Sequence, residues 1–530
     1  MARFKSDNAA SGNNRQTTTA RNSRASIVMI DERTPVLIAA GQVVEREASS
    51  TSPMQLAAIA ARNAITNAGS DDIISHIDTI AVTRLFSDMG ELWPCPWGRS
   101  NNPPESIARQ LGAKPKHRIY SQVGGNEPQA FVIEFARDIA MGKRDMVLIA
   151  GAEATKNQRY ATRNNTVLNW YEQFSEPLDD RGIDASVVTD QEINNGLFNV
   201  LYYYALIEQA QRHQAGRSIN QHQQAMAALL ASFSRVAANN PYAQFVGQQS
   251  AADILGAAPL TNLYTKRMVA QDSVNQGAAL IMCSLAKARE LAISDNNIIY
   301  LHGLAHASDV PVSQRSKPET SIVATRVVDQ ALHTAKLTID DIALIDIYSC
   351  FPCAVTAVAK HLSLPIDGSR ELTVTGGLPY FGGPGNNYSM HALAEIVMQL
   401  RQRPDQYALV TANGGVLSKH ASGVYSRRPS TIDWSTHETK TNIADIPVHN
   451  IDYAPSGGTI ISYTIYPDHS GALQVIVLAQ TDSNKRFVAI NAKDDTTTVA
   501  AMTTEEPSGK AIIVTFGDNG KLYFQLAHQQ

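Results

Sequence analysis

Short apolar runs alternate with stretches of helical periodicity along most of the chain, a pattern typical of an α/β fold. Pro35–Gly41 is an apolar run that predicts the first strand. Ser52, followed by a proline, predicts the start of a helix that ends near Gly69. His76–Val82 predicts the next strand, and the stretch 121–153 predicts a strand, a glycine corner, a helix and a buried strand. The chain therefore begins as an alternation of strands and helices.

This order of elements occurs twice. A helix predicted over Thr320–Ala335 and a strand over Ile342–Tyr348 repeat the first helix and the strand that follows it. The stretch 372–415 then repeats 121–153. Each has a strand, a Gly-Gly corner followed by Asn, a helix with an apolar face, and a buried strand that ends in small residues. Self-similarity over such a distance predicts a duplicated α/β unit.

Three segments lie outside the repeat. Residues 158–260 have mostly helical periodicity and predict an insertion, so the two halves span 31–265 and 266–430. Residues 440–530 alternate or run apolar between turn residues, which predicts a small all-β domain, a barrel or a sandwich. Its predicted strands are Thr459–Tyr466, Leu473–Leu478, Phe487–Ile490 and Ala511–Phe516. Residues 1–30 are rich in basic and small polar side chains and are expected to form a flexible tail; a transit peptide is the weaker interpretation, because no amphipathic stripe is present.

Composition narrows the class of protein. The chain has 530 residues, of which 44% are hydrophobic and 18% charged, and its formal net charge of -4 gives no reason to expect nucleic acid as a partner. Its four cysteines show no paired metal-ligand spacing, so no metal site or disulfide framework is expected, and a reducing cytoplasm is the natural location. No apolar run approaches the roughly 20 residues of a membrane span.

Four short motifs carry a family resemblance. VGGNEPQ, IDIYSCFPCAV, GGPGNN and ANGG occur in this order, at matching places of the two halves. Over residues 31–430 the chain resembles the thiolase superfamily, and with its extra β domain it is similar to the type 1 thiolase-like proteins. The resemblance implies a duplicated five-layer α-β-α-β-α core with a helical insertion. It also implies an acetyl-CoA acetyltransferase-like protein that takes acyl-CoA as its partner, with the CoA thioester as substrate or ligand and no further cofactor.

The resemblance also bears on assembly. Thiolases usually pair through the edge strand of the core, so a homodimer is the default expectation. An added domain that blocks this edge would leave a monomer.

The residues that perform catalysis in working thiolases are replaced. The resemblance places Gly124 at the nucleophilic cysteine, Gly383 at the activating histidine and Ala412 at the acid/base cysteine. Cys350 falls where one thiolase subgroup carries a cysteine that assists the proton chemistry. What remains are two glycine corners, each opening a helix, whose free N–H groups are expected to hold a thioester carbonyl or another anionic oxygen.

The candidate catalytic residues are Cys350, as acid/base or makeshift nucleophile, His391, as substitute base, and His420, near the expected pocket. The candidate ligand-binding residues are Gly124, Gly125, Asn126, Tyr348, Ser349, Gly382, Gly383, Asn386, Asn413 and Gly414. Each also has a structural alternative. The glycines would serve a backbone that needs positive φ, Asn126 would cap a helix, Cys350 would be an inert buried thiol, and the histidines would be buried or capped.

Two functions remain open on these residues. One is an acyl-CoA-binding protein of acyltransferase descent, with atypical or weak activity in carbon–carbon condensation or thioester cleavage. The other is a non-catalytic acyl-CoA-binding or scaffold protein whose β domain recruits a partner. In a third version the β domain itself stands in for a partner subunit that completes the site.

Overall fold

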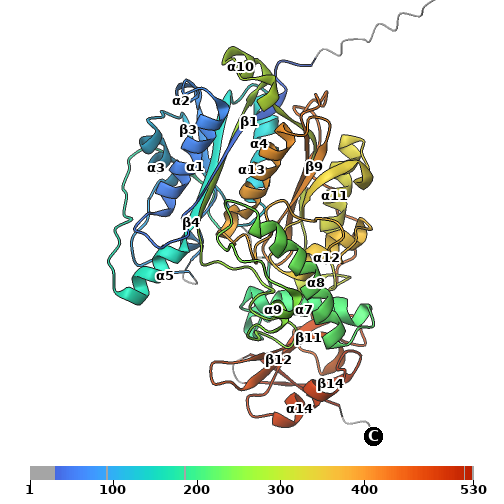
Figure 1. Ribbon diagram of the computed structural model, residues 1–530. Coiled ribbons are helices and arrows are strands. Elements are labelled where there is room, and N and C mark those ends of the chain that lie inside the picture. Colours follow the sequence, from blue (N-terminus) through green and yellow to red (C-terminus); the bar gives the residue numbers. More distant parts are fainter. Residues whose placement is uncertain (1–29, 91–92, 184–186, 518–519, 528–530) are drawn as a thin grey trace, which may run out of the picture.

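The computed structural model describes residues 30–90, 93–183, 187–517 and 520–527 (Figure 1). The tail expected over residues 1–30 therefore lies almost wholly outside the described residues. None of the helices in these ranges is long and apolar enough to cross a membrane.

The N-terminal half follows the predicted alternation. Its elements are β1 (Pro35–Val44), α1 (Pro53–Ala68), α2 (Ile73–His76), β2 (Thr79–Val82), η1 (Phe86–Asp88), α3 (Pro103–Leu111), β3 (His117–Tyr120), α4 (Glu127–Ala140) and β4 (Met146–Ala154). Helix α1 begins as predicted, because Ser52 forms a capping box with Gln55, and it ends at Gly69, which takes a left-handed conformation.

The C-terminal half repeats this order after the insertion. Its elements are β6 (Asn275–Ser284), α10 (Leu285–Glu290), η2 (Asp295–Asn297), β7 (Ile299–Ser308), η3 (Val312–Gln314), α11 (Ile322–Ala335), η4 (Ile339–Asp341), β8 (Ile342–Asp346), α12 (Pro352–His361), η5 (Gly385–Asn387), α13 (Tyr388–Arg401), β9 (Tyr407–Gly414) and β10 (Lys419–Ser426).

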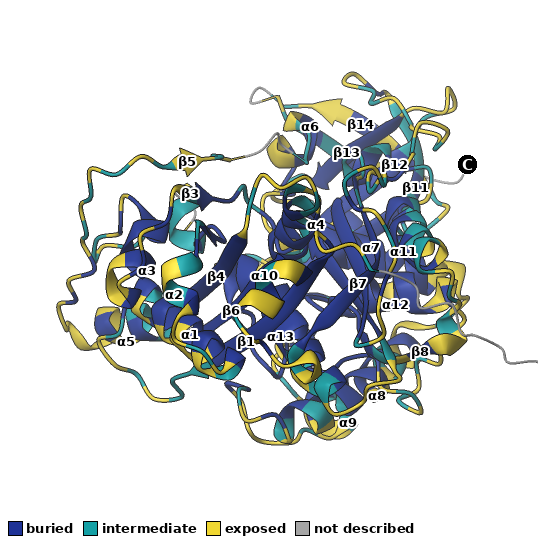
Figure 2. Cartoon of the chain, turned by 90° about the horizontal axis from the view of Figure 1, so that it is seen from above, coloured by how far each residue is buried: buried dark blue, intermediate teal, exposed yellow. Residues whose placement is uncertain are grey.

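Both halves contribute to one ten-stranded sheet in the order β5-β3-β2-β4-β6-β1-β7-β10-β9-β8. Strand β1 joins them, since it pairs with β6 along its length and with β7 at Val36 and Leu37. Helices α4 and α13 lie side by side in the middle and pack against strands of both halves, while α1 and α11 cover the outer faces (Figure 1). The central strands are buried and the outer helices carry the exposed residues (Figure 2).

The insertion is only partly helical. Its elements are α5 (Thr155–Asn164), β5 (Asp179–Asp180), α6 (Asp190–Asn194), α7 (Val200–Gln214), α8 (Ile219–Ala238) and α9 (Ala251–Leu255). Between α5 and α6, where helical structure was expected, the described residues form an extended segment that adds β5 to the edge of the sheet beside β3. Of the described residues of this segment, only Asp179 and Asp180 pair with a strand, and the expected helical periodicity does not describe it.

The C-terminal residues form the predicted small β domain, and it is a closed barrel of the order β11-β12-β13-β15-β14. Its elements are β11 (Gly457–Pro467), β12 (Leu473–Gln480), β13 (Arg486–Asn491), α14 (Thr496–Thr504), β14 (Ala511–Phe516) and β15 (Leu522–Leu526). The last strand and α14 were not predicted. The barrel lies below the insertion helices in Figure 1, at the end of the molecule away from β3 and α2.

One predicted strand is absent. The residues at 372–375, expected to enter the second corner as a strand, are irregular. The buried carboxylate of Asp346 accepts the N–H groups of Val374 and Thr375 and the hydroxyl of Thr373, so this backbone bonds to a side chain and not to a neighbouring strand. Burial raises the pKa of Asp346 to about 6.

Candidate functional site

The two glycine corners meet where the halves of the core come together. Each corner opens one of the central helices, α4 or α13. The hydroxyl of Ser389, in the first turn of α13, donates to the carbonyl of Gly125 at 2.7 Å. Conversely, the amide of Asn387 at the second corner donates to the carbonyl of Gly151 in β4 at 2.7 Å. Each corner is therefore packed against the other half of the duplicated core.

The first corner presents unused donors. Among the described residues, no hydrogen-bond partner is found for the backbone N–H groups of Gly124, Gly125 and Asn126. A Cβ at Gly125 would lie 2.2 Å from the hydroxyl of Tyr348 and 2.6 Å from the carbonyl of Asn413, so only glycine allows this approach. The corner is a small cradle of amides with a phenol directly beside it.

The hydroxyl of Tyr348 has no hydrogen-bond partner within the described ranges, although only 7% of the residue is exposed. Burial raises the pKa of Tyr348 well above its ordinary value, so the phenol stays protonated and keeps a proton to donate. The Tyr348 hydroxyl is therefore a donor that the described residues leave free for a ligand oxygen or for water.

Cys350 follows Tyr348 by two residues and lies in a different contact. The amide of Asn413 donates to its sulfur at 3.7 Å and to the hydroxyl of Tyr204 at 3.0 Å. Burial raises the pKa of Cys350 to about 12, and the hydrogen bond from Tyr204 lowers it only in part. The thiol is therefore neutral near pH 7, which disfavours Cys350 as a nucleophile, because the thiolate is the reactive form.

Other polar groups at the first corner are only partly paired. The side-chain oxygens of Asn126 and Asn413 are buried and have no partner in the part of the chain that the structure describes. Asn126 occupies the first position before α4, but its side chain makes no capping bond and donates instead to Glu127. Gly414 packs against Gly124, since a Cβ at Gly414 would lie 2.9 Å from the Gly124 Cα.

The hydroxyl of Ser349 takes part in a structural hydrogen bond. It accepts the N–H of Leu378 at 3.2 Å, in the segment that leads to the second corner.

The second corner differs in part: protein groups use the N–H of Gly383 and the side-chain amide of Asn386 and fill the space beside Gly382, although no partner is found among the described residues for the N–H of Gly382. The N–H of Gly383 donates to the carbonyl of Gln271 at 2.8 Å, and the amide of Asn386 donates to the carbonyl of Arg84 at 2.8 Å. A Cβ at Gly382 would lie 2.4 Å from the side-chain oxygen of Gln276. The expectation of free N–H groups thus fails at Gly383, and Asn386 serves to tie the two halves together.

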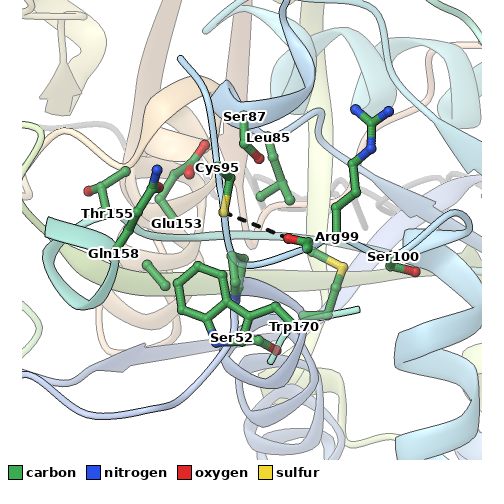
Figure 3. A pocket seen from close by; sticks show the side chains of 14 residues that line it. Ser52, Leu85, Ser87, Cys95, Arg99, Ser100, Glu153, Thr155, Gln158 and Trp170 are labelled. Carbon is green, nitrogen blue, oxygen red and sulfur yellow. Dashed lines mark hydrogen bonds between the residues drawn. The ribbon is translucent and has the colours of Figure 1, made fainter. Parts of the chain in front are cut away.

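Glu153 occupies the space beside the second corner. A Cβ at Gly385 would lie 2.4 Å from its carboxyl oxygen, which accepts the N–H of Phe86 at 2.8 Å. Glu153 lines a cavity of about 20 Å³ together with Cys95 and Trp170 (Figure 3). Burial raises the pKa of Glu153 to about 8. At this corner a side chain of the protein takes the place that a ligand would need.

His391 and His420 lie in separate surroundings. His391 is fully buried in α13, its Nδ1 bonds to the side-chain oxygen of Gln42 at 2.7 Å, and its ring packs against Phe381. Burial lowers the pKa of His391 to about 3. No described contact joins it to Cys350, so this geometry argues against a substitute base.

His420 lies closer to the first corner. It pairs with Asn413 across β10 and β9, and it lines a cavity of about 20 Å³ that Tyr348 and Asn413 also line. Its Nε2 bonds to the hydroxyl of Ser321 at 3.0 Å, and burial lowers its pKa to about 4. A cavity of this size holds about one water molecule.

Two residues of this region were missed from the sequence. The ammonium of Lys419 donates to the carbonyl of Val123 at 2.8 Å, at the entry to the first corner. Tyr204, from the insertion helix α7, accepts hydrogen bonds from Asn413 and from the N–H of Leu417. Lys419 is the sequence neighbour of His420, and this position was the signal that could have identified it. No local pattern links Tyr204 to a turn some two hundred positions away.

The geometry allows oxygen binding by neutral donors and does not favour covalent acyl transfer. Three backbone amides, unpaired among the described residues, and the Tyr348 hydroxyl lie at one corner, and donors of this kind can stabilise a carbonyl oxygen or a developing oxyanion. Within the described ranges, no group of three or more His, Cys, Asp or Glu side chains could hold a metal ion.

A duplicated α/β unit with two facing glycine corners defines a thiolase-type protein, and the comparisons agree. The solved structure of a monomeric SCP2-thiolase-like protein type 1 from Mycobacterium smegmatis is 34% identical, with a TM-score of 0.79, and the match covers 94% of this chain and 100% of that one. This chain belongs to the SCP2-thiolase-like family, within the thiolase superfamily. No protein-family model matches the chain.

Two curated relatives are archaeal acetyl-CoA acetyltransferases. The protein of Methanocaldococcus jannaschii is 23% identical over 290 residues, which cover 50% of this chain and 66% of that protein. The protein of Methanothermobacter thermautotrophicus is 26% identical over 215 residues, which cover 37% and 54%. The chain thus matches less than two thirds of the length of both.

Proposed function

We propose that this chain binds an acyl-CoA, with the thioester carbonyl held at the first glycine corner, and that it does not transfer the acyl group through a cysteine. The observation that carries the proposal is the set of unpartnered donors at one point: the amides of Gly124, Gly125 and Asn126 and the hydroxyl of Tyr348. The names of the curated relatives support a CoA thioester as the ligand class. The same proposal includes the five-layer order of the core and a role in lipid metabolism.

The contrast between the corners supports this choice of site. At the second corner the N–H of Gly383 and the amide of Asn386 are engaged, and Glu153 fills the remaining space. An acyl carbonyl would have to displace these protein–protein bonds there, whereas at the first corner it would satisfy groups that have no partner. We therefore assign the ligand to the first corner, where more donors lack a partner among the described residues.

The alternative is catalysis by Cys350. A thiol with a pKa of about 12 is almost entirely protonated near pH 7, so it would act as a weak acid and not as a nucleophile. If chemistry occurs, we expect proton transfer by Tyr348 or Cys350 on a carbonyl polarised by the amides, without a covalent intermediate.

The test compares binding of acetyl-CoA and free CoA by isothermal titration calorimetry. Tyr348→Phe removes the donor hydroxyl but keeps the ring, so it should weaken acetyl-CoA binding by about five- to thirtyfold and leave free CoA unaffected. Tyr300→Phe, a buried tyrosine of β7, is the matched control and should change neither.

Two results would contradict the proposal. One is an unchanged affinity of Tyr348→Phe for acetyl-CoA. The other is a stable acetyl adduct on Cys350, detected by mass spectrometry after incubation with acetyl-CoA. That result would support the alternative, catalysis by Cys350.

A further inference from the structure

The insertion helix α7 lies between the candidate site and the barrel. Figure 1 shows the barrel below the insertion helices, with β11 next to α7, and the C-terminal half of the core above them. One helix therefore contacts both the residues near the first corner and the added β domain.

On the side of the site, α7 touches both thiols of the Cys350–Cys353 segment. The hydroxyl of Tyr204 accepts the amide of Asn413, which also donates to Cys350, and the Tyr204 ring stacks on Phe351 at 4.2 Å between centroids. The thiol of Cys353 lies 3.6 Å from the backbone carbonyl of Tyr204. Movement of α7 would therefore uncover Cys350 and Cys353 together.

On the opposite side, the barrel packs against the same turns of α7. The ring of Tyr466 stacks on Tyr202 at 3.8 Å between centroids, two residues before Tyr204. The hydroxyl of Ser462 donates to the carbonyl of Leu206 at 2.6 Å, two residues after it. Further along the helix, buried Arg212 forms an ion pair with Glu506.

The barrel also holds the loop that supports α7 from the side. The N–H of Asn262 donates to the carbonyl of Ile465 at 2.8 Å, and the Asn262 side chain accepts the N–H of Ile465. Two residues later, the hydroxyl of Tyr264 bonds to the carbonyl of Tyr204 at 3.2 Å and to Glu208 at 2.9 Å. Strand β11 is thus connected to Tyr204 by two routes, one through the helix and one through this loop.

We propose that the barrel is a brace, formed by Ser462, Tyr466 and Glu506, that fixes α7 and so keeps Tyr204 closed over Cys350 and Asn413. The barrel then acts within the chain and holds the residues of the candidate site in place. The meaning of the brace for ligand binding rests on the proposed function. Its test uses no acyl-CoA, so either proposal can fail without the other.

The test measures how fast each cysteine is alkylated by N-ethylmaleimide, with the labelled positions read by tandem mass spectrometry. Tyr466→Ala removes the stacked ring and Ser462→Ala removes a single hydrogen bond, and neither residue touches a thiol in the described contacts. Cys283 is the internal reference, because it is fully buried in β6 and belongs to a different hydrophobic cluster from Cys350 and Cys353. Phe516→Ala is the control variant, since Phe516 is 57% exposed on β14.

Loosening the brace should raise the labelling rates of Cys350 and Cys353 by about five- to thirtyfold in Tyr466→Ala, and by less in Ser462→Ala. The rate of Cys283 and all rates in Phe516→Ala should stay within about twofold of the unmodified chain. Two outcomes overturn the proposal. One is an unchanged Cys350 rate in both brace variants, and the other is an equal rise at Cys283, which would mean a general loss of stability. If Tyr466→Ala does not fold, Ser462→Ala decides the question alone.

Discussion

At the scale of single residues, what a corner of the backbone can bind depends on which of its polar groups are already used. The first corner keeps the amides of Gly124 and Gly125 unpaired beside the phenol of Tyr348. At the second corner the N–H of Gly383 bonds to Gln271, and the side-chain amide of Asn386 bonds to Arg84 of the other half. The duplication supplied two similar corners, and the side chains near each one give them different hydrogen-bond partners.

Glu153 yields a prediction about pH. Burial raises its pKa from an ordinary 4.5 to about 8, and Asp88 and Asp272 add to the rise. Because the folded state holds the proton more tightly than the unfolded chain, the free energy of unfolding should fall as the pH rises from 4.5 towards 8. Glu153→Gln removes this titration and should be more stable than the unmodified chain by roughly 1 to 3 kcal/mol at about pH 8.5.

Thermal unfolding followed by circular dichroism at several pH values measures this difference. Glu290→Gln, on the surface helix α10, is the control and should follow the unmodified chain. The prediction is wrong if Glu153→Gln loses stability with rising pH as steeply as the unmodified chain does.

At the scale of elements, the short strand β5 explains how the edge of the sheet is covered. It pairs in parallel with β3, placing Asp179 opposite Ile119 and Asp180 opposite Tyr120. Arg181 then bonds to both carboxylate oxygens of Glu134 in α4, at 2.6 and 2.7 Å. The edge is thus blocked by the insertion, and not by the added domain as one expectation from the sequence had it.

This arrangement predicts a monomer, in line with the monomeric relative from Mycobacterium smegmatis. Arg181→Ala removes the two bonds from the end of β5 to α4, which adds to the ion pair of Asp180 with Arg84, and should loosen the cover on the edge of β3, because an unpaired edge strand attracts other strands. Size-exclusion chromatography with light scattering should show a monomer for the unmodified chain and larger species for Arg181→Ala.

Arg163→Ala, on the exposed face of α5, serves as the control and should remain a monomer. A dimer formed by the unmodified chain, or a fully monomeric Arg181→Ala, would refute this account of the edge.

The sequence could predict the elements whose signals are local. Ser52 and Gly69 bound α1 as expected, because capping depends on residues within one turn of the helix end. The strand expected at 372–375 failed because its backbone bonds to Asp346, about thirty positions earlier. The motifs placed Gly124 and Tyr348 in the sequence, and the structure brings Tyr348 beside the first corner. Tyr204 lay beyond that reach, because only the fold brings α7 to Asn413.

At the scale of the whole molecule, the two halves, the insertion and the barrel form a connected series of contacts. The central helices α4 and α13 bring the corners together, α7 covers the segment after Tyr348, and the barrel packs on α7. The barrel face toward the insertion includes Ile476 and Val488, which are buried in the same cluster as residues of α7. The added domain is therefore part of the core's support.

The central claim is that one corner binds the acyl carbonyl, and a crystal structure with a non-hydrolysable acetyl-CoA analogue tests it most directly. The account predicts the carbonyl oxygen within about 3.2 Å of the Gly125 nitrogen and of the Tyr348 hydroxyl. A carbonyl oxygen bound beside Gly383 or elsewhere in the molecule, with the first-corner amides still unpaired, would contradict it.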